Sequence, residues 1–236
     1  MKKNFLWTAL IVSILFAVIC FGFESFESAP VSSEPKRVAL VFDDGPFPNH
    51  APILLELLAR EQIRATFSFV ASNVHRFEST AKAVIASGHE VANHSCTHCH
   101  PNGLTDSELE NEIVGGQKLI TETTGYVPKW YWPPFLETDR RMPALAIKAG
   151  IEVYSLKSVI DTKDYDRSVS GRGIRRYATR NVADGSVIVF HEWREETREQ
   201  LPAILAELRR QNCVFLTFSE LAKELRITNP AEKSVL

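Results

Sequence analysis

The feature that most constrains the fold is a regular alternation of short apolar segments with longer amphipathic ones from residue 37 to residue 225. Short buried strands separated by helices indicate a parallel sheet with right-handed crossovers, and about seven such units favour an α/β barrel over an open sheet. The expected strands are Val38–Phe42, Ala65–Val70, Glu90–Ala92, Lys129–Trp132, Ile151–Ser155, Ser186–Phe190 and Val214–Thr217. The expected helices are Ala51–Arg60, Ser79–Ala86, Asp106–Thr123, Arg140–Ala149, Gly173–Thr179 and Glu195–Arg210.

Several of these helices carry start and stop signals. Thr105 followed by Glu108 predicts a capping box, and Thr138 predicts an N-cap. Glycine is the residue most often found just after a helix end. The glycines expected to end helices are Gly88, Gly125 and Gly150.

The N-terminus differs in kind from the rest of the chain. Met1-Lys2-Lys3 precedes an uncharged apolar run, so residues 1–23 are expected to be a signal-anchor or a cleaved signal peptide. Residues 24–36 are expected to form a linker, residues 37–225 a single catalytic domain, and residues 226–236 a C-terminal tail. Because the lysines favour the cytoplasmic side, the domain is expected to be extracytoplasmic, and membrane-bound if the segment is not cleaved.

Composition narrows the class of protein. The chain is 44% hydrophobic with a net charge of -2, and its basic residues look scattered, which argues against a nucleic-acid partner. Cys20 lies in the apolar run, leaving three cysteines that allow at most one disulfide but do not define its pairing. They are Cys96, Cys99 and Cys213.

Polar side chains follow four of the expected strands. The carboxyl ends of barrel strands meet at one face, where active sites form. We therefore expect these side chains to gather at that face. They are Asp43, Asp44, Asn93, His94, His98, Asp161, Asp164, His191 and Glu192.

His94 and His98 are four residues apart, a spacing that lets both imidazoles reach one ion. Two histidines and a carboxylate such as Asp44 leave an open position on zinc, the arrangement of a catalytic site. A metal-free histidine pair is the alternative. The overlapping Cys-Thr-His-Cys-His stretch, Cys96 to His100, also matches the c-type haem attachment pattern.

FDDGP (Phe42–Pro46), followed by HSCTH (His94–His98), resembles the first two motifs of the polysaccharide deacetylases, family four of the carbohydrate esterases. The resemblance extends from about Arg37 to Leu225. It implies a deformed (β/α) barrel and a divalent metal, usually Zn²⁺. It also implies hydrolysis of N- or O-acetyl groups on a sugar polymer.

The resemblance assigns roles to individual residues. Asp43 corresponds to the general base, His191 to the general acid, and Asp161 to the carboxylate that partners His191. Asp44, His94 and His98 correspond to the metal ligands. One carboxylate would thus bind the cation while its neighbour accepts a proton, which suits two adjacent aspartates.

The YWPPF stretch departs from the family's third motif, where an arginine normally holds the base aspartate. Trp132 occupies the arginine position and Phe135 the tyrosine position, whose backbone N–H would still serve as oxyanion donor. Asp43 is therefore expected to lack its cationic partner, unless Lys129, Arg140 or Arg141 replaces it. Trp132, Pro134 and Tyr165 are expected to contact substrate.

The expected function is metal-dependent removal of acetyl groups from N-acetylated amino sugars in peptidoglycan or a chitin-like glycan. Trp132 raises one alternative, a non-catalytic glycan-binding pseudoenzyme of the same fold. The other alternative is an O-acetyl esterase that acts on a xylan-type glycan.

Overall fold

The computed structural model describes residues 34–228, and the folded unit begins at Pro35. The predicted signal or anchor segment, most of the predicted linker, and residues 229–236 of the predicted tail lie outside the described residues. Among residues 34–228, no helix is both long and apolar enough to cross a bilayer.

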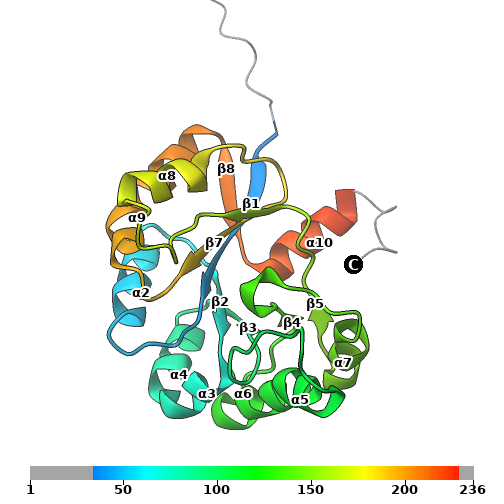
Figure 1. Ribbon diagram of the computed structural model, residues 1–236. Coiled ribbons are helices and arrows are strands. Elements are labelled where there is room, and N and C mark those ends of the chain that lie inside the picture. The colour runs from blue at the N-terminus through cyan, green and yellow to red at the C-terminus, as the bar shows by residue number, and fades with distance from the viewer. Residues whose placement is uncertain (1–33, 229–236) are drawn as a thin grey trace, which may run out of the picture. The chain divides into compact units, whose positions relative to one another are not determined.

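All strand pairs in the described residues are parallel, in the spatial order β5-β4-β3-β2-β1-β7-β6, with β8 paired to β1 (Figure 1). No described pair joins β5 to β6, so the barrel is not closed there. The predicted deformed (β/α) barrel is confirmed. The strands are β1 (Lys36–Asp43), β2 (Thr66–Phe69), β3 (Glu90–Asn93), β4 (Trp130–Tyr131), β5 (Glu152–Val153), β6 (Val159–Asp161), β7 (Ser186–His191) and β8 (Cys213–Leu216).

β1 is the centre of the sheet. β7 pairs with it from Val38 to Asp43 on one side. On the other side β8 pairs with residues 36–39 and β2 with residues 41–43. Six consecutive β1 residues, 38–43, are buried, which is why this strand is an almost continuous apolar run.

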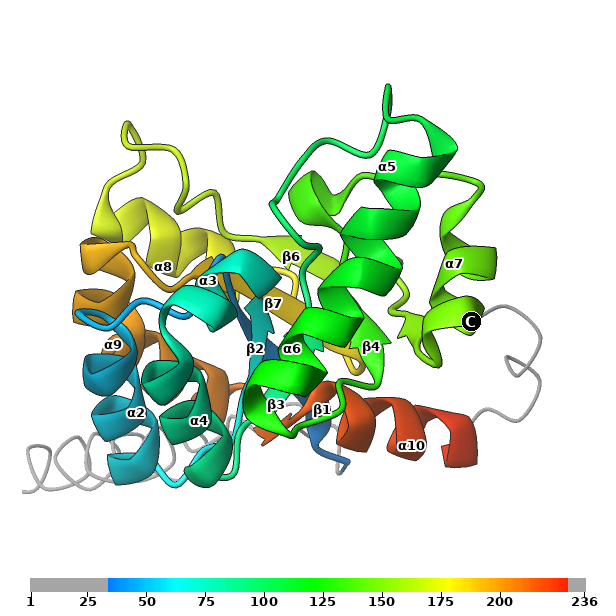
Figure 2. The same cartoon turned by 90° about the horizontal axis from the view of Figure 1, so that it is seen from below.

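Helices surround the sheet, and Figure 2 shows α2, α4 and α9 along one flank with α5, α6 and α7 on another. They are α2 (Ala51–Arg60), α3 (Ala71–Arg76), α4 (Glu78–Ala86), α5 (Asp106–Glu110), α6 (Gly116–Thr124), α7 (Met142–Ala149), α8 (Gly171–Thr179), α9 (Glu195–Arg210) and α10 (Phe218–Thr228). A π-helical turn, Asn111–Gly115, joins α5 to α6, and a 3-10 turn spans Pro134–Leu136.

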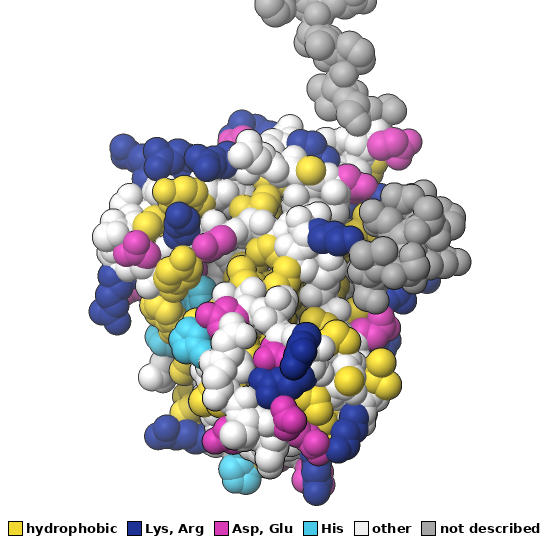
Figure 3. Space-filling model, turned by 45° about the vertical axis from the view of Figure 1, so that its right-hand side comes forward, with side chains coloured by type: hydrophobic (Ala, Val, Ile, Leu, Met, Phe, Trp, Pro, Cys, Tyr) yellow, Lys and Arg dark blue, Asp and Glu magenta, His cyan; other side chains and the backbone are white. Residues whose placement is uncertain are grey.

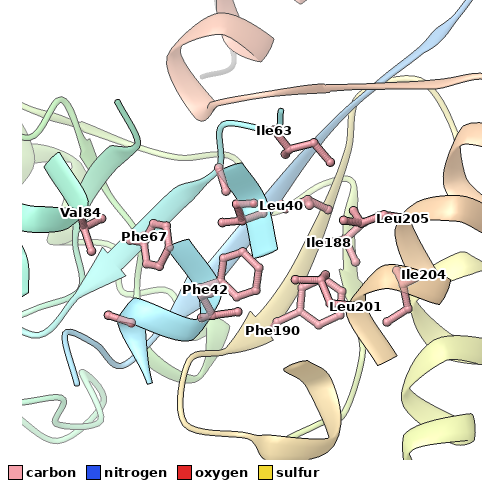
Figure 4. Packing of buried hydrophobic residues seen from close by; sticks show 14 of the residues in the cluster. Leu40, Phe42, Ile63, Phe67, Val84, Ile188, Phe190, Leu201, Ile204 and Leu205 are labelled. Atoms are coloured by element: carbon pink, nitrogen blue, oxygen red, sulfur yellow. The ribbon is translucent and has the colours of Figure 1, made fainter. Parts of the chain in front are cut away.

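Aromatic residues on three adjacent strands form the centre of the core. The Phe42 ring lies between Phe67 and Phe190, with centroid distances of 5.3 and 5.7 Å. Figure 4 shows Leu201, Ile204 and Leu205 of α9 packed against the β7 side of this row. This packing fixes β1, β2 and β7 relative to one another, and with them the residues at their carboxyl ends.

Some boundaries differ from the sequence expectations. The Thr105 capping box is present, and Gly125 and Gly150 are left-handed C-caps at φ 75° and 74°. Thr138 is not an N-cap, because α7 begins at Met142. The elements β6, α3 and α10 were not anticipated. For α10 the sequence does hold a signal, since Thr217 and Glu220 form a capping-box pair at its start.

Candidate active site

The two aspartates of the VFDDGP stretch end β1 and diverge. Asp43 is the last β1 residue and is 4% exposed. Asp44 follows it in the left-handed backbone region at φ 74°, which turns its side chain toward the β3 end of the face. Asp44 therefore reaches His94 and His98 while Asp43 stays beside it.

Asp44, His94 and His98 form a cluster suited to one cation. Their ligand atoms lie within 4.8 Å of one another, and Asp44 Oδ1 is 3.1 Å from His98 Nε2 and 3.6 Å from His94 Nε2. Burial acts to raise the pKa of Asp44, but the contacts with the two histidines outweigh it and lower the pKa. Asp44 Oδ1 is buried without a hydrogen-bond partner, as expected of an oxygen reserved for a metal. The residues thus fit a divalent cation.

The ligands are oriented by neighbouring groups. His94 Nδ1 lies 2.7 Å from the Trp132 carbonyl oxygen, so Nδ1 carries the proton and Nε2 is free to ligate. Trp193 Nε1–H donates to Asp44 Oδ2 at 2.8 Å, which leaves Oδ1 facing the histidines. Trp193 follows β7 by two residues, and the sequence did not reveal this contact.

Asp43 is held by an indole. Trp132 Nε1–H donates to Asp43 Oδ2 at 3.0 Å, and Oδ1 has no hydrogen-bond partner. Burial is the largest effect on Asp43 and raises its pKa above the usual value, despite the opposing positive charges of His94 and His191. A buried carboxylate with one free oxygen is suited to accept a proton.

Two sequence expectations about Trp132 are corrected. Its side chain is fully buried, packed against Phe218 and Tyr154, so it is not a substrate-stacking surface. It is instead the partner of Asp43, supplying a neutral N–H donor. Arg141 does not take this role, since its guanidinium binds Asp139, Asp106 and the Leu104 carbonyl.

His191, the last residue of β7, is paired with Asp164. His191 Nδ1 lies 2.7 Å from Asp164 Oδ1, and Asp164 Oδ2 accepts from His191 N and Thr197 Oγ1. Burial acts to lower the pKa of His191, but the fully buried Asp164 carboxylate outweighs it and raises the pKa to about 9. His191 is therefore protonated at neutral pH.

The assignment of Asp161 as the partner of His191 is thus wrong, although Asp164 stands only three residues further on. Asp161 accepts from Lys163 N and Tyr165 Oη, and lines the pocket. The chain after β6 brings Asp164, and not Asp161, to hydrogen-bond distance of His191 Nδ1.

The opposite rim of the pocket is formed by the YWPPF loop. Phe135 is 48% exposed and adopts a left-handed conformation at φ 58°. Its ring stacks on His100 with centroids 3.6 Å apart and meets the edge of His98. Among the hydrogen bonds of residues 34–228, none uses the Phe135 backbone N–H, so this donor is available to a ligand. Pro134 is buried beneath it.

Tyr165 lies on the His191 side of the pocket. It is 51% exposed and its ring meets the edge of His191. Its position suits the predicted substrate contact, which stays a prediction.

The described cysteines, Cys96, Cys99 and Cys213, are free thiols. His100, which a c-type haem would require as its ligand, is bound to Glu137 and stacked on Phe135. In this structure the stretch contributes His98 to the candidate metal cluster and His100 to the wall of the pocket.

Glu192 is buried directly behind the aspartates. Its Oε1 accepts from Phe47 N, and burial raises its pKa to about 8. Its Oε2 lies 1.9 Å from where a Cβ on Gly45 would stand, so a side chain at position 45 would displace the Glu192 carboxyl. Glu192 is therefore a mostly neutral carboxyl that supports the turn after Asp44.

These groups converge on one cavity of about 410 Å³. Figure 3 shows the face on which histidine, acidic and hydrophobic side chains gather at a hollow. The cavity is lined by Asp43, Asp44, His94, His98, His100, Phe135, Leu136, Glu137, Asp161, Tyr165, Val189, His191 and Trp193.

Comparisons with known proteins agree with this geometry. The family model described as polysaccharide deacetylase matches residues 31–154. A peptidoglycan-N-acetylglucosamine deacetylase of Bacillus cereus is 30% identical over 196 residues, covering 82% of this chain and 91% of that protein. The peptidoglycan-N-acetylglucosamine deacetylase PgdA of Listeria monocytogenes is 29% identical over 83% of this chain, which spans only 41% of PgdA's length.

Solved structures of carbohydrate esterase family 4 proteins share the fold of this chain. A family 4 carbohydrate esterase from Streptomyces lividans in complex with acetate superimposes with a TM-score of 0.70 at 29% identity, covering 76% of this chain and 91% of that one. A family pseudoenzyme from Bacillus anthracis shares the fold, with a TM-score of 0.72 at 21% identity over 80% of this chain and 66% of that one. The family model covers more than half of this chain, and the Bacillus cereus relative matches most of both chains, so the chain belongs to the polysaccharide deacetylase family.

Proposed function

We propose that this protein hydrolyses acetyl groups from N-acetylated amino sugars of an envelope polysaccharide, with a divalent metal held by Asp44, His94 and His98. The observation that carries the proposal is the convergence of this ligand cluster with a free carboxylate oxygen of Asp43 and a protonated His191 in one cavity. Relatives named as peptidoglycan deacetylases support the substrate class.

The donor set suits Zn²⁺, which accepts two imidazoles and a carboxylate and retains an open position. When bound, such a cation supplies Lewis-acid chemistry, polarising a carbonyl and lowering the pKa of water.

The chain's own residues account for the proton transfers. Asp43 Oδ1, which is free of hydrogen bonds, accepts a proton from the attacking water. The Phe135 backbone N–H donates to the acetyl carbonyl oxygen, which becomes the oxyanion as the water attacks. His191, protonated because of Asp164, gives its Nε2 proton to the departing sugar nitrogen.

Acetate release from N-acetylglucosamine oligomers, peptidoglycan fragments and acetylated xylan tests this function. We expect release from an N-acetylated glycan, loss of release with a chelator, and loss in Asp43→Asn. Asp106→Asn, an exposed aspartate paired only with Arg141, is the matched control and should keep full activity. Full activity of Asp43→Asn would contradict the role of Asp43, and release from acetylated xylan alone would favour the O-acetyl esterase.

Trp132 favours a second candidate, a glycan-binding protein without turnover. A neutral indole stabilises the ionised Asp43 less than a guanidinium would. This candidate predicts metal and glycan binding with no acetate release from any of the three substrates. The same domain would then act in the extracytoplasmic space as a binding module.

A further inference from the structure

The exposed face of α8 gathers positive charge that has no counterion. From Arg167 to Ala183 the chain carries five arginines and no acidic residue, in a protein with a net charge of -2. This stretch is therefore a local concentration of positive charge in a chain whose basic residues otherwise look scattered. Figure 3 shows a band of Lys and Arg along the upper left of the face, where Figure 1 places α8. The arginines are Arg167, Arg172, Arg175, Arg176 and Arg180, all of them exposed.

Within the described part of the chain, none of the five guanidinium groups forms an ion pair or a hydrogen bond. Three cations instead surround one aromatic ring. Lys163 Nζ, Arg176 Cζ and Arg180 Cζ lie 5.6, 5.5 and 5.4 Å from the centroid of the Tyr177 ring. The ring attracts each cation weakly, while the cations repel one another. An anion between them would remove that repulsion.

One arginine of the cluster lies at the unfavourable end of the helix dipole. Arg172 stands in the first turn of α8, where the dipole favours acidic residues and α8 has none. Arg176 in the last turn and Arg180 at the C-cap lie where the dipole favours positive charge, so the unfavourable part of their placement is their mutual repulsion around Tyr177.

The cluster adjoins the catalytic pocket. A second cavity of about 390 Å³ runs beside β6 and is lined by Asp161, Lys163, Tyr177, Arg180 and Asn181, among others. Asp161 also lines the catalytic cavity, so the two cavities share this residue. A polymer strand whose acetylated sugar lies at the metal ligands would therefore continue past Asp161 toward Tyr177.

We propose that Lys163, Arg176, Tyr177 and Arg180 form a subsite that binds carboxylate groups of an acidic acetylated glycan, such as a strand bearing lactyl or peptide carboxylates. This inference rests on the proposed function and names the substrate class of the same site. The guanidinium fork matches a carboxylate in two parallel hydrogen bonds, and the Tyr177 ring offers an apolar face to a sugar. A neutral chitin-like strand offers only hydroxyl and amide oxygens, so these cations would add little to its binding affinity.

The test compares two double variants. The patch variant, Arg176→Gln/Arg180→Gln, removes two charges of the subsite, and the control, Arg60→Gln/Lys223→Gln, removes two positive charges elsewhere. Both pairs are exposed, so both variants should melt near the wild type. Acetate release is measured on acidic peptidoglycan fragments, on the same fragments with amidated carboxylates, and on neutral N-acetylglucosamine oligomers. We expect the ratio of kcat/KM for acidic over amidated fragments to fall about 3- to 10-fold in the patch variant, mainly through KM, and to stay at the wild-type value in the control.

Salt should lower this ratio in the wild type and leave it nearly constant in the patch variant. An unchanged ratio in the patch variant would overturn the subsite, as would an equal fall in the control. Loss of binding to phosphatidylglycerol vesicles with an unchanged ratio would also overturn it, and would assign the cations to a lipid surface.

A binding measurement separates this inference from the proposed function. Calorimetric titration of the wild type, the patch variant and the control with acidic fragments needs no turnover. If no substrate releases acetate but the patch variant binds acidic fragments more weakly than the control, the proposed function fails and the subsite stands. Equal binding by all three proteins overturns the subsite alone.

Discussion

The Trp132 indole N–H donates to Asp43 Oδ2 across 3.0 Å, at the position where the family's arginine is expected. The donor is neutral and the contact is fully buried, so Asp43 keeps an oriented partner without gaining a counter-charge. Burial raises the pKa of Asp43, and the hydrogen bond from the neutral Trp132 side chain opposes that rise.

Trp132→Phe should therefore lower kcat/KM by about tenfold or more, a typical loss for one contact to a catalytic group. Without the N–H the pKa of Asp43 rises further, so the acidic limb of the pH profile should move to higher pH. Trp130→Phe is the matched control, since its indole donates to Ser219 Oγ, outside the catalytic pocket. An acidic limb that stays in place in Trp132→Phe would show that the indole does not tune Asp43.

Asp164→Asn should shift the alkaline limb of kcat/KM. Asp164 raises the pKa of His191 to about 9, so wild-type activity should persist into mildly alkaline pH and fall as His191 loses its proton. Without the carboxylate, burial dominates and the pKa of His191 drops. The alkaline limb should therefore move to lower pH by one unit or more, and each unit corresponds to about 1.4 kcal/mol of lost stabilisation of the protonated imidazole. The pH dependence of acetate release measures this.

Asp161→Asn distinguishes the two aspartates. Asp161 bonds Tyr165 Oη and Lys163 N and makes no hydrogen bond to His191, so its variant should keep the wild-type alkaline limb. A shift in Asp161→Asn with none in Asp164→Asn would reverse the assignment.

Metal content should follow the ligand cluster. We expect about one Zn²⁺ per chain after reconstitution, and loss of most of it in His94→Ala and His98→Ala, because two remaining ligands bind zinc weakly. His100→Ala, at the rim of the same pocket but paired with Glu137, should keep the metal. Elemental analysis after dialysis gives the stoichiometry, and loss of metal from His100→Ala alone would point to a different ligand set.

In protein from which metal has been removed with a chelator, Glu192→Gln should make the free energy of unfolding less dependent on pH. The pKa of Glu192 rises from 4.5 to about 8 on folding, so the folded state keeps a proton that the unfolded state loses. The contribution is present below pH 4.5 and is lost as pH rises toward 8, at no more than about 1.4 kcal/mol per pH unit.

Urea unfolding of both proteins between pH 5 and pH 8 tests this. The stability difference between Glu192→Gln and wild type should grow in favour of the variant as pH rises. A constant difference would mean that Glu192 titrates near its ordinary value.

The candidate metal ligands and the candidate acid and base could be located from the sequence because each lies at a strand end or shortly after one. A strand end fixes a side chain at the barrel face within one or two residues, so Asp43, Asp44 and His191 fall where the pattern put them. His94 and His98 are also local to the end of β3, but they converge through a bend with Ser95 and His98 in the left-handed region at φ 69° and 64°, and not on the helical turn that their spacing favours.

Contacts that depend on loop geometry could not be predicted. Asp161 and Asp164 follow the same short strand, and a turn with Lys163 at φ 56° decides which one meets His191. The direction of the Trp132 indole is set by Phe218 and Tyr154, which come from distant parts of the chain. β6 has only three residues, too few to show a period.

The divided pairing of β1 also sets the order in which the domain can assemble. The first half of β1 needs β8, which is made about 175 residues later, while its second half needs β2 close by in the chain. A chain emerging from the ribosome or an export channel would thus carry an incomplete central strand until its last strand arrives. Asp43 and Asp44 would reach their final positions only after nearly the whole domain has been synthesised.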